Sequence, residues 1–337
     1  TTADDGPTTT SDTNGVPCDE PPAVAPRWQS LSPPGDLPPV RHSHALAYDA
    51  ARGRVVLFGG LASGYDGDDT SLLGDTWEWD GCAWTEVATE GPSPREGQGM
   101  VYDDTRGVVL LFGGNSGMAG GPSDELWQWD GAQWTLVASG GPQPRWKHGM
   151  AYDGARDRIV VFGGEPGAKD DTWEWDGAQW VDVSPLDDGP EGRSRMGMAY
   201  DVQRGETILF GGRTMGSEDL GDTWAWDGAA WEAREDVEPS GWNRSRHDMV
   251  YDSARAVMVV FGGYSGPFRN DTLEWDGATW TQVEPVTQMN PNAPSRRIYA
   301  HMAYHAALGA TVLFAGFDGD PLGGDPPLQD TWLWGGP

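Results

Sequence analysis

The 337-residue sequence is poor in cysteine, lysine and long apolar runs. It holds two cysteines, and only two of its 22 basic residues, Lys147 and Lys169, are lysines. No run of 18 apolar residues occurs, so the sequence predicts no membrane-spanning helix. Acidic residues number 52, and the net charge of −30 would repel phosphate backbones and anionic lipid. Nucleic acid binding and membrane insertion are therefore not expected.

The first 26 residues have almost nothing to bury. They are mostly Thr, Asp, Pro and Gly and begin with Thr1 rather than Met, which predicts a disordered acidic tail on a processed chain. Such a tail often follows an export signal, and two cysteines outside any CxxC motif are compatible with one disulfide. We therefore expect an exported protein, extracellular, periplasmic or at the cell surface, in a mature form without its signal. A cytosolic origin is the alternative.

What the sequence has in excess is glycine, proline and tryptophan. Its 49 Gly, 26 Pro and 19 Trp indicate many short strands joined by turns. The motif Phe-Gly-Gly recurs at intervals of 48 to 54 residues, beginning at Phe58, Phe112, Phe162, Phe210 and Phe261, with the variant Phe314-Ala-Gly316. An apolar stretch ending in Tyr precedes each copy, and Trp-x-Trp-Asp-Gly and a further Trp follow most copies. Each unit is therefore expected to hold four strands.

Alternation in the first strand of each unit predicts how neighbouring sheets pack. In five units a Met stands two residues before the Tyr, on the same face of the strand, while small residues fill the other face. These methionines are Met100, Met150, Met198, Met249 and Met302. A large face packed on the small face of the next sheet would suit stacked sheets, with the tryptophans between them.

The order of these motifs resembles the kelch family, in which a glycine pair ends the second strand and a Trp opens the fourth. The resemblance covers about residues 27–337 and departs from the common pattern in using Trp-x-Trp in the third strand. It implies an all-β, six-bladed propeller of four-stranded antiparallel blades around a central channel. The expected blades span about 41–87, 95–137, 145–183, 193–233, 244–284 and 297–334, after a tail at 1–26.

The last unit lacks its fourth strand, because the chain stops soon after Trp334. The segment 27–31 contains Trp28 and is followed by a Pro-rich stretch and Arg41, as the fourth strand beginning at Trp84 is followed by Arg95. We therefore expect 27–31 to complete the last blade and close the ring, which removes an open sheet edge.

This topology also bears on the two cysteines. The chain before Trp28 would lie on the side of the Asp-Gly hairpins, and Cys82 sits in the hairpin of the adjacent first blade. The residues from Cys18 to Trp28 could span roughly 30 Å when extended. A Cys18–Cys82 disulfide is predicted, with two free thiols as the alternative.

Strand alternation places two sets of connections on each face of the ring. The short connections between strands one and two and between strands three and four define the turn face. The variable connections between strands two and three and between blades define the loop face, where we expect any site. Six arginines in register could surround the channel there and bind a carboxylate or sulfate, unless each pairs with a blade carboxylate such as Asp75 or Asp124. They are Arg41, Arg95, Arg145, Arg193, Arg244 and Arg297.

Two further groups belong to the loop face. Trp146, Trp242 and Tyr264 could stack on sugar rings or grip a peptide, the alternative being that they anchor loops. The two longest loops between strands two and three carry Asp66, Asp68, Asp69, Asp318, Asp320 and Asp325. Ring closure would make these loops neighbours, so we expect either a calcium site or a solvated acidic rim.

The sequence lacks the metal-binding motifs of known kelch-type enzymes. The resemblance to galactose-oxidase-like enzymes would imply a copper site of two His and two Tyr, with one Tyr cross-linked to Cys. The expected positions of Cys18 in the tail and Cys82 in a turn-face hairpin do not suit this site. No Glu-x-x-x-Asp-x-x-x-His run, which holds iron in the specifier proteins, precedes any of the six His. We expect no cofactor other than calcium and no catalytic residues. The alternative, by similarity to sialate epimerases, is an acid/base pair of His301 with Arg297.

Together these features predict an exported, monomeric binding or scaffold module whose loop face recognises a glycan or a protein segment. The alternative is a sugar-active enzyme, an isomerase or oxidoreductase, with its site at the channel mouth. Fold resemblance alone does not decide between them.

Overall fold

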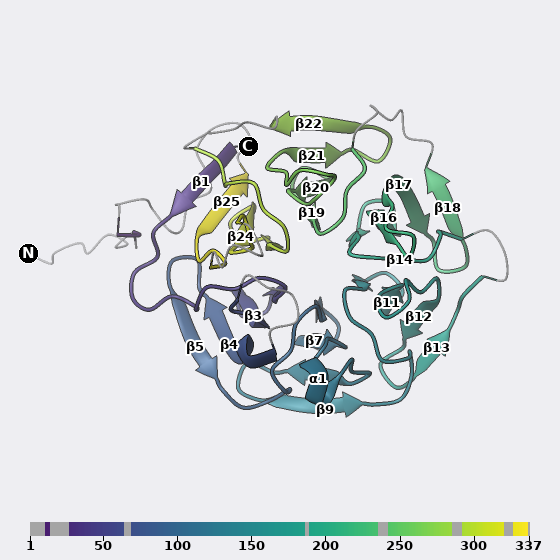
Figure 1. The fold of residues 1–337 in the computed structure, drawn as a ribbon, viewed down its shortest axis with the longest axis horizontal. Helices are drawn as coiled ribbons and strands as arrows, with labels where there is room; N and C mark the ends of the chain where they lie inside the picture. Colours follow the sequence, from purple (N-terminus) through teal and green to yellow (C-terminus); the bar gives the residue numbers. More distant parts are fainter. Residues whose placement is uncertain are drawn as a thin grey trace, which may run out of the picture.

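Six antiparallel sheets surround a central axis in the computed structural model (Figure 1). The structure describes residues 11–13, 27–63, 69–185, 189–234, 242–284, 292–319 and 326–335. Helical structure in these ranges is confined to α1 (Gly117–Gly120) and the 3-10 helix η1 (Asp69–Ser71), and no helix in them is long and apolar enough to cross a membrane. The all-β, six-bladed propeller that the resemblance implies is confirmed.

Each blade begins with its innermost strand and ends at the rim. Blade one consists of β2 (Ala45–Asp49), β3 (Arg54–Leu61), β4 (Leu72–Trp79) and β5 (Trp84–Ala88). Blade two consists of β6 (Gly99–Asp103), β7 (Val108–Phe112), β8 (Leu126–Trp129) and β9 (Trp134–Ala138). Blade three consists of β10 (Gly149–Asp153), β11 (Arg158–Phe162), β12 (Thr172–Trp175) and β13 (Trp180–Asp182). Blade four consists of β15 (Gly197–Asp201), β16 (Glu206–Thr214), β17 (Asp219–Trp226) and β18 (Trp231–Arg234), and the short β14 (Arg193–Ser194) also pairs with β16. Blade five consists of β19 (Asp248–Asp252), β20 (Val257–Phe261), β21 (Thr272–Trp275) and β22 (Trp280–Glu284). Blade six consists of β23 (His301–His305), β24 (Ala310–Phe314), β25 (Thr331–Gly335) and β1 (Arg27–Leu31).

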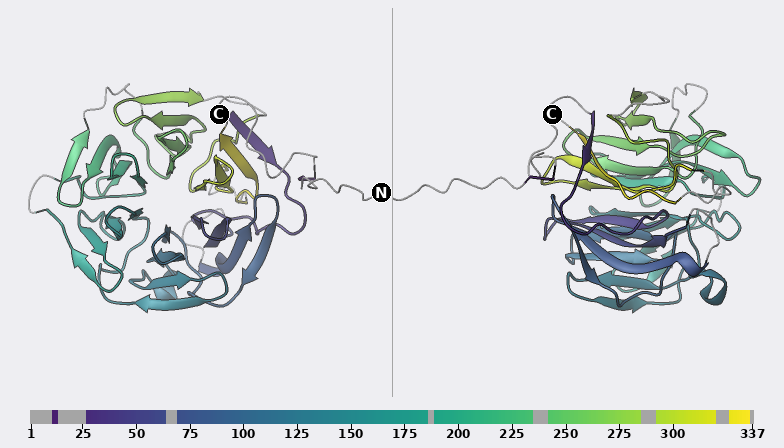
Figure 2. Two further views of the ribbon diagram at one scale, coloured as in Figure 1. Left: turned by 180° about the vertical axis from the view of Figure 1, so that it is seen from behind. Right: turned by 60° about the vertical axis from the view of Figure 1, so that its left-hand side comes forward.

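Strand β1 closes the ring, as the repeat predicted. It pairs with β25 in antiparallel register, with Trp28 opposite Trp334, and the two strands lie side by side at the rim in opposite views (Figures 1 and 2). The indole of Trp28 packs on Phe261 of blade five at 4.7 Å and donates a hydrogen bond to Thr272 Oγ1 at 2.9 Å. The N-terminal strand therefore completes blade six and also holds it to blade five.

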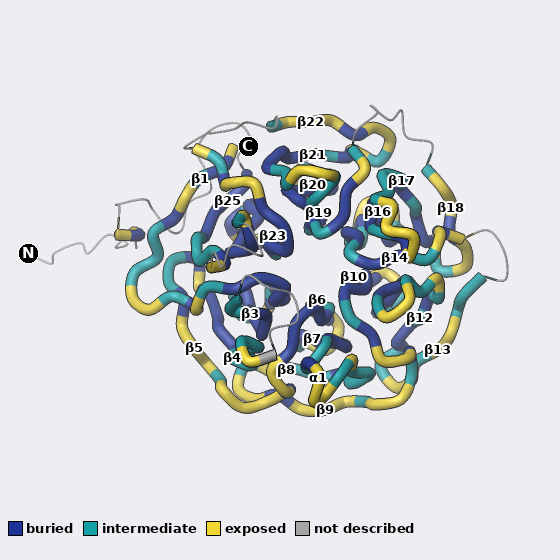
Figure 3. The backbone as a smooth tube through the Cα atoms, in the orientation of Figure 1, coloured by how far each residue is buried: buried dark blue, intermediate teal, exposed yellow. Residues whose placement is uncertain are grey.

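The predicted packing of large on small faces forms the core between blades. Met100 of blade two packs in one cluster with Ala45 and Ala47 of blade one, and the same pattern recurs around the ring. A Cβ on Gly99 would lie 2.8 Å from Met150, so the small face has no room for a larger side chain. Burial is concentrated on the inner strands, and exposed residues are frequent on the outermost ones (Figure 3).

The glycine pairs make the turn at the end of the second strand possible. In blade one Gly59 and Gly60 have φ of +66° and +105°, and a Cβ on Gly60 would lie 2.7 Å from the carbonyl oxygen of His42. Glycine therefore serves both the left-handed backbone and the close approach of the next inner segment. In blade six Ala315 takes the first position with φ of +55°, so that position tolerates a methyl group.

Candidate functional site: the central channel

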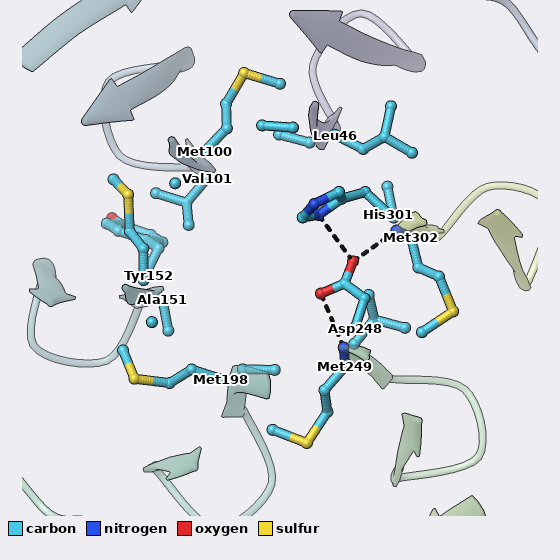
Figure 4. Close-up of a pocket in the computed structure, with 18 of the residues that line it drawn as sticks. Leu46, Met100, Val101, Ala151, Tyr152, Met198, Asp248, Met249, His301 and Met302 are labelled. Carbon is cyan, nitrogen blue, oxygen red and sulfur yellow. Dashed lines mark hydrogen bonds and ion pairs between the residues drawn. The ribbon is translucent and has the colours of Figure 1, made fainter. Parts of the chain in front are cut away.

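The inner strands enclose a cavity of about 530 Å³ on the propeller axis. All six blades contribute to its wall, and Figure 4 shows side chains from several of them around the open centre. The residues just before each inner strand lie at the loop-face end of the channel, and the turn after each inner strand lies at the turn-face end.

Six residues form a closed ring of backbone hydrogen bonds at the loop-face end, which we call the mouth ring. Each residue donates its N–H to the carbonyl oxygen of its equivalent in the preceding blade, over 2.6 to 3.1 Å. All six have a left-handed backbone, with φ between 51° and 65°. The members are Ser43, Gly97, Lys147, Arg195, Arg246 and Tyr299. Five of the six are not glycine, and for them this backbone conformation costs about 1 kcal/mol or more per residue.

Lys147 and Tyr299 lie across the mouth ring. The Lys147 ammonium lies 4.0 Å from the ring centroid of Trp146 and 4.9 Å from that of Tyr299. Lys147 and Tyr299 belong to blades three and six, which are opposite in a ring of six, so this contact crosses the channel. Both residues are only 7% exposed. The loop-face end of the channel is therefore largely filled by side chains.

The other two cations of the mouth ring have different partners. Arg195 forms an ion pair with Glu165 at 2.8 Å. The Nε of Arg246 donates to the Tyr299 hydroxyl at 2.8 Å, and its guanidinium lies 5.1 Å from the ring centroid of Tyr264. Aromatic rings therefore position Arg246, whereas a carboxylate neutralises Arg195.

Asp248 and His301 line the next level of the channel, where the other blades have only Ala45, Gly99, Gly149 and Gly197. The Nδ1 of His301 lies 3.4 Å from the Asp248 carboxylate (Figure 4). The same carboxylate accepts hydrogen bonds from the backbone N–H groups of Met249 and Met302, at 2.9 and 2.6 Å. Asp248 is thus fixed between blades five and six, and it orients the imidazole.

The sequence interpretation named His301 but paired it with Arg297 and missed Asp248. Arg297 is 1% exposed and pairs with Asp330 at 2.6 Å, so it is not available to His301. The sequence did hold a signal for Asp248, because it stands at a repeat position that is otherwise small or His.

Below this pair the channel wall is apolar. One level consists of small and β-branched side chains, namely Ala47, Val101, Ala151, Ala199, Val250 and Ala303. The six tyrosines of the repeat follow at the turn-face end, and some of their hydroxyls bond the turn of the preceding blade, as Tyr102 accepts from the Ala51 N–H at 3.2 Å. The tyrosines therefore tie neighbouring blades together at this end.

The six arginines in register are buried rather than presented to a ligand. Each is at most 1% exposed and donates to the carbonyl oxygen of the first residue of its blade's glycine pair, or of Ala315 in blade six. Each also pairs with a carboxylate of its blade, at Asp75, Glu125, Asp171, Asp222, Asp271 and Asp330. The alternative of structural pairing thus describes all six, and Glu125 replaces Asp124 as the partner of Arg95. We do not retain these arginines as ligand-binding residues.

The three predicted aromatic site residues lie outside the channel wall. Trp146 contacts Lys147, and Tyr264 contacts Arg246, so both support cations of the mouth ring. Trp242 packs against the core between blades four and five. These contacts fit the alternative that the aromatics anchor loops, while their role in binding stays a prediction.

Three histidines occupy one repeat position just before the innermost strand of their blades, and two of them, His148 and His247, line the channel. His44, His148 and His247 are buried, and burial lowers the pKa of each, to about 3 for His148 and His247. Nearby arginine charge, Arg145 for His148 and Arg244 for His247, lowers these pKa values further. They are therefore uncharged core residues near neutral pH.

The calcium and disulfide predictions fall largely on residues outside the described ranges. Asp66, Asp68, Asp320 and Asp325 are in that part, as is Cys18. Asp69 begins η1, and Asp318 is exposed. Within the described ranges no group of three or more His, Cys, Asp or Glu could hold a metal ion. Calcium binding and the Cys18–Cys82 pair both stay predictions.

No family model matches the chain. Part of it is similar to dynein regulatory complex subunit 7 of Chlamydomonas reinhardtii, with 33% identity over 91 residues. The match covers 26% of this chain and 7% of that protein, so the chain spans a small fraction of the length of the curated relative that it matches.

Proposed function

We propose that this protein is a kelch-type propeller that acts as a binding or scaffold module and recognises a protein segment on its loop face. The propeller fold suits such a role, because a rigid ring holds loops of varied length and sequence. The observation that carries the proposal is the exposure of two methionines on this face. Met118 in α1 and Met215 between β16 and β17 are 96% and 81% exposed.

Methionine suits a protein-binding surface for a physical reason. Its side chain is unbranched and polarizable, so it adapts to the shape of an apolar partner. Met118 and Met215 belong to blades two and four, and both lie on connections between the second and third strands of a blade. Such loops carry binding residues more often than the strands that hold them. A glycan would instead be expected to stack on exposed aromatic rings, whereas Trp146, Trp242 and Tyr264 are half-buried.

The partial relative is consistent with this reading. Its name describes a subunit of a regulatory complex. We propose the same general kind of role for this chain, without transferring the complex itself. The glycine pairs and repeated tryptophans favour membership of the kelch family. An alignment of homologues in which these positions vary freely would contradict that assignment.

The loop-face proposal can be tested with a synthetic peptide array and a glycan array probed with the same labelled protein. We expect peptide binding that is lost when Met118→Lys and Met215→Lys are combined. Val202→Lys is the matched control, because Val202 is 63% exposed on the turn face. Binding to glycans alone, or peptide binding that survives the double substitution, would refute the proposal.

A sugar-active enzyme is the second candidate, and the Asp248–His301 pair is the observation that favours it. A carboxylate beside Nδ1 orients a histidine so that Nε2 can take part in proton transfer. If His301 abstracts a proton next to a sugar carbonyl, reducing sugars incubated in heavy water should gain deuterium at that carbon. His301→Ala should abolish this exchange. A panel of sugars that gains no deuterium with the wild-type protein would exclude this candidate.

Export is proposed on the tail composition and the two cysteines. Expression of the full gene product in its source cell, followed by fractionation, would test it. Recovery in the cytosol alone would contradict export.

A further inference from the structure

We propose that the central channel binds a small organic monoanion, whose charged group is held by Arg246 and whose non-polar body lies along the apolar wall. This site is separate from the loop-face surface of Met118 and Met215, which do not line the cavity. The two proposals therefore stand or fall independently.

Arg246 is the residue that selects an anion. It lines the cavity, is half-buried, and uses Nε for the Tyr299 hydroxyl. Across the part of the chain that the structure describes, no carboxylate lies within ion-pair distance of this guanidinium. Its contacts are instead the rings of Tyr264 and Tyr299, at 5.1 and 5.7 Å. A guanidinium oriented by aromatic faces, with its terminal nitrogens still able to donate, is suited to bind a carboxylate or sulfonate through two hydrogen bonds.

The other charged groups around the channel favour a single negative charge on the ligand. Arg195 is neutralised by Glu165, and Lys147 lies against Trp146 and Tyr299. Asp248, beside His301, adds a negative charge one level below the mouth ring. Asp104 lies at the opposite end of the cavity, and the whole protein carries −30. These negative charges would repel a dianion such as a phosphate monoester, and the cations around the channel are too few to balance its second charge.

The wall below Arg246 suits a non-polar body. Ala151, Ala199 and Ala303, with their equivalents in the other blades, offer few hydrogen bonds to water or to a polar ligand. The cavity volume of about 530 Å³ lies within the range of small-molecule sites, which combine apolar walls with a few polar groups. A straight-chain carboxylate fits this combination, with its tail displacing water from an apolar wall.

Burial indicates that the ligand enters from the turn face. At the loop-face end, Ser43, Lys147 and Tyr299 are at most 7% exposed. At the other end the wall continues to exposed residues such as Val202 and Ser253. The chain rises roughly 16 Å from Arg246 to Tyr251, which gives the depth of the channel between the mouth ring and the tyrosines.

Calorimetric titration of the full chain with octanoate and with 1-octanol tests the proposal. The two probes share a tail and differ in charge. We expect saturable octanoate binding and much weaker 1-octanol binding. Arg246→Gln should reduce octanoate affinity about 10- to 100-fold, as expected for loss of a hydrogen bond to a charged group, and leave 1-octanol unaffected. Arg246→Lys, which keeps the charge, should lose less.

Two controls keep the test specific. Arg213→Gln removes a loop-face cation that pairs with Asp219 and does not line the cavity, so octanoate affinity should not change. Ala199→Val with Ala303→Val narrows the wall with residues that the repeat already accepts as Val101 and Val250, and should weaken both probes. Absence of saturable octanoate binding, or affinity unchanged by Arg246→Gln or by the narrowed wall, would overturn the proposal.

Discussion

At the scale of single residues, a repeated ion pair differs between blades in its access to water. Arg244 and Asp271 of blade five have fully buried side chains, whereas in blade four Arg193 is buried and the side chain of Asp222 is 40% exposed. Removing one partner of a buried pair leaves the other charge without solvent or counter-charge, which is strongly destabilising. Breaking the ion pair should therefore lower the free energy of unfolding more in blade five than in blade four.

Asp271→Asn should accordingly lower the free energy of unfolding by about 3–5 kcal/mol. Asp222→Asn should cost less, since water reaches the carboxylate site and can solvate Arg193 when the pair is broken. Urea denaturation of the two variants measures the difference. Equal losses would show that burial does not set the strength of these pairs.

Because His148 is buried, we expect the free energy of unfolding to decrease as the pH falls below neutral. Burial, assisted by the nearby charge of Arg145, lowers its pKa from 6.5 to about 3. In the unfolded chain this residue binds a proton below pH 6.5, while in the folded protein it stays neutral until about pH 3. The unfolded state thus binds more protons in this window, and stability falls by up to about 1.4 kcal/mol per pH unit from this residue.

His148→Gln tests this effect, because Gln98 occupies the equivalent position in blade two and donates to the Phe58 carbonyl oxygen. Urea denaturation from pH 7 to pH 4 should show a shallower dependence of stability on pH in the variant. The same slope in both proteins would mean that other groups cause the acid sensitivity.

At the scale of elements, β1 differs from every other strand because it joins the two ends of the chain. Its five residues pair along the whole of β25, and Trp28 also bonds Thr272 in blade five. Just after it, Ser32 bonds Asp12 and Thr13, so residues 11–13 are attached to this closure. Without β1 the edge of β25 would be unpaired and the core between blades five and six would be open to water.

Deletion of residues 1–31 should therefore lower the melting temperature sharply, whereas deletion of residues 1–10 should change it little. Trp28→Ala in the full chain should cost about 3–5 kcal/mol, as for other buried aromatic residues. Thermal unfolding followed by circular dichroism measures all three. Similar melting of both truncations and the full chain would refute the role of β1 in closure.

At the scale of the whole molecule, the excess of negative charge opposes the compact state. The net charge of −30 is distributed over a folded chain, and local ion pairs neutralise only part of the 52 acidic residues. Repulsion among exposed carboxylates is screened by salt, while the buried pairs are screened much less.

Raising sodium chloride from about 10 mM to about 300 mM should therefore raise the melting temperature, because the Debye length falls below the distance between most surface charges. Scanning calorimetry at neutral pH measures the effect, with a neutral osmolyte as control. A fall in melting temperature would mean that exposed ion pairs stabilise the fold more than like charges destabilise it.

The sequence by itself determined the architecture of this protein. Glycine pairs, tryptophans and alternating Met and Tyr recur with a constant period, and local chemistry such as positive φ and face alternation has the same meaning in every copy. Even the closure by Trp28 could be inferred, because a missing strand at one end matched a spare strand at the other.

Only the tertiary structure decided which polar residues remain available for function. The pattern placed six arginines at the channel, but in the structure they are buried and each pairs with a carboxylate. Asp248 of blade five lies beside His301 of blade six. The position of Arg246 between two tyrosine rings also depends on three segments far apart in the chain. Contacts between side chains of different blades depend on how the blades pack around the axis, and no periodicity along the chain specifies them.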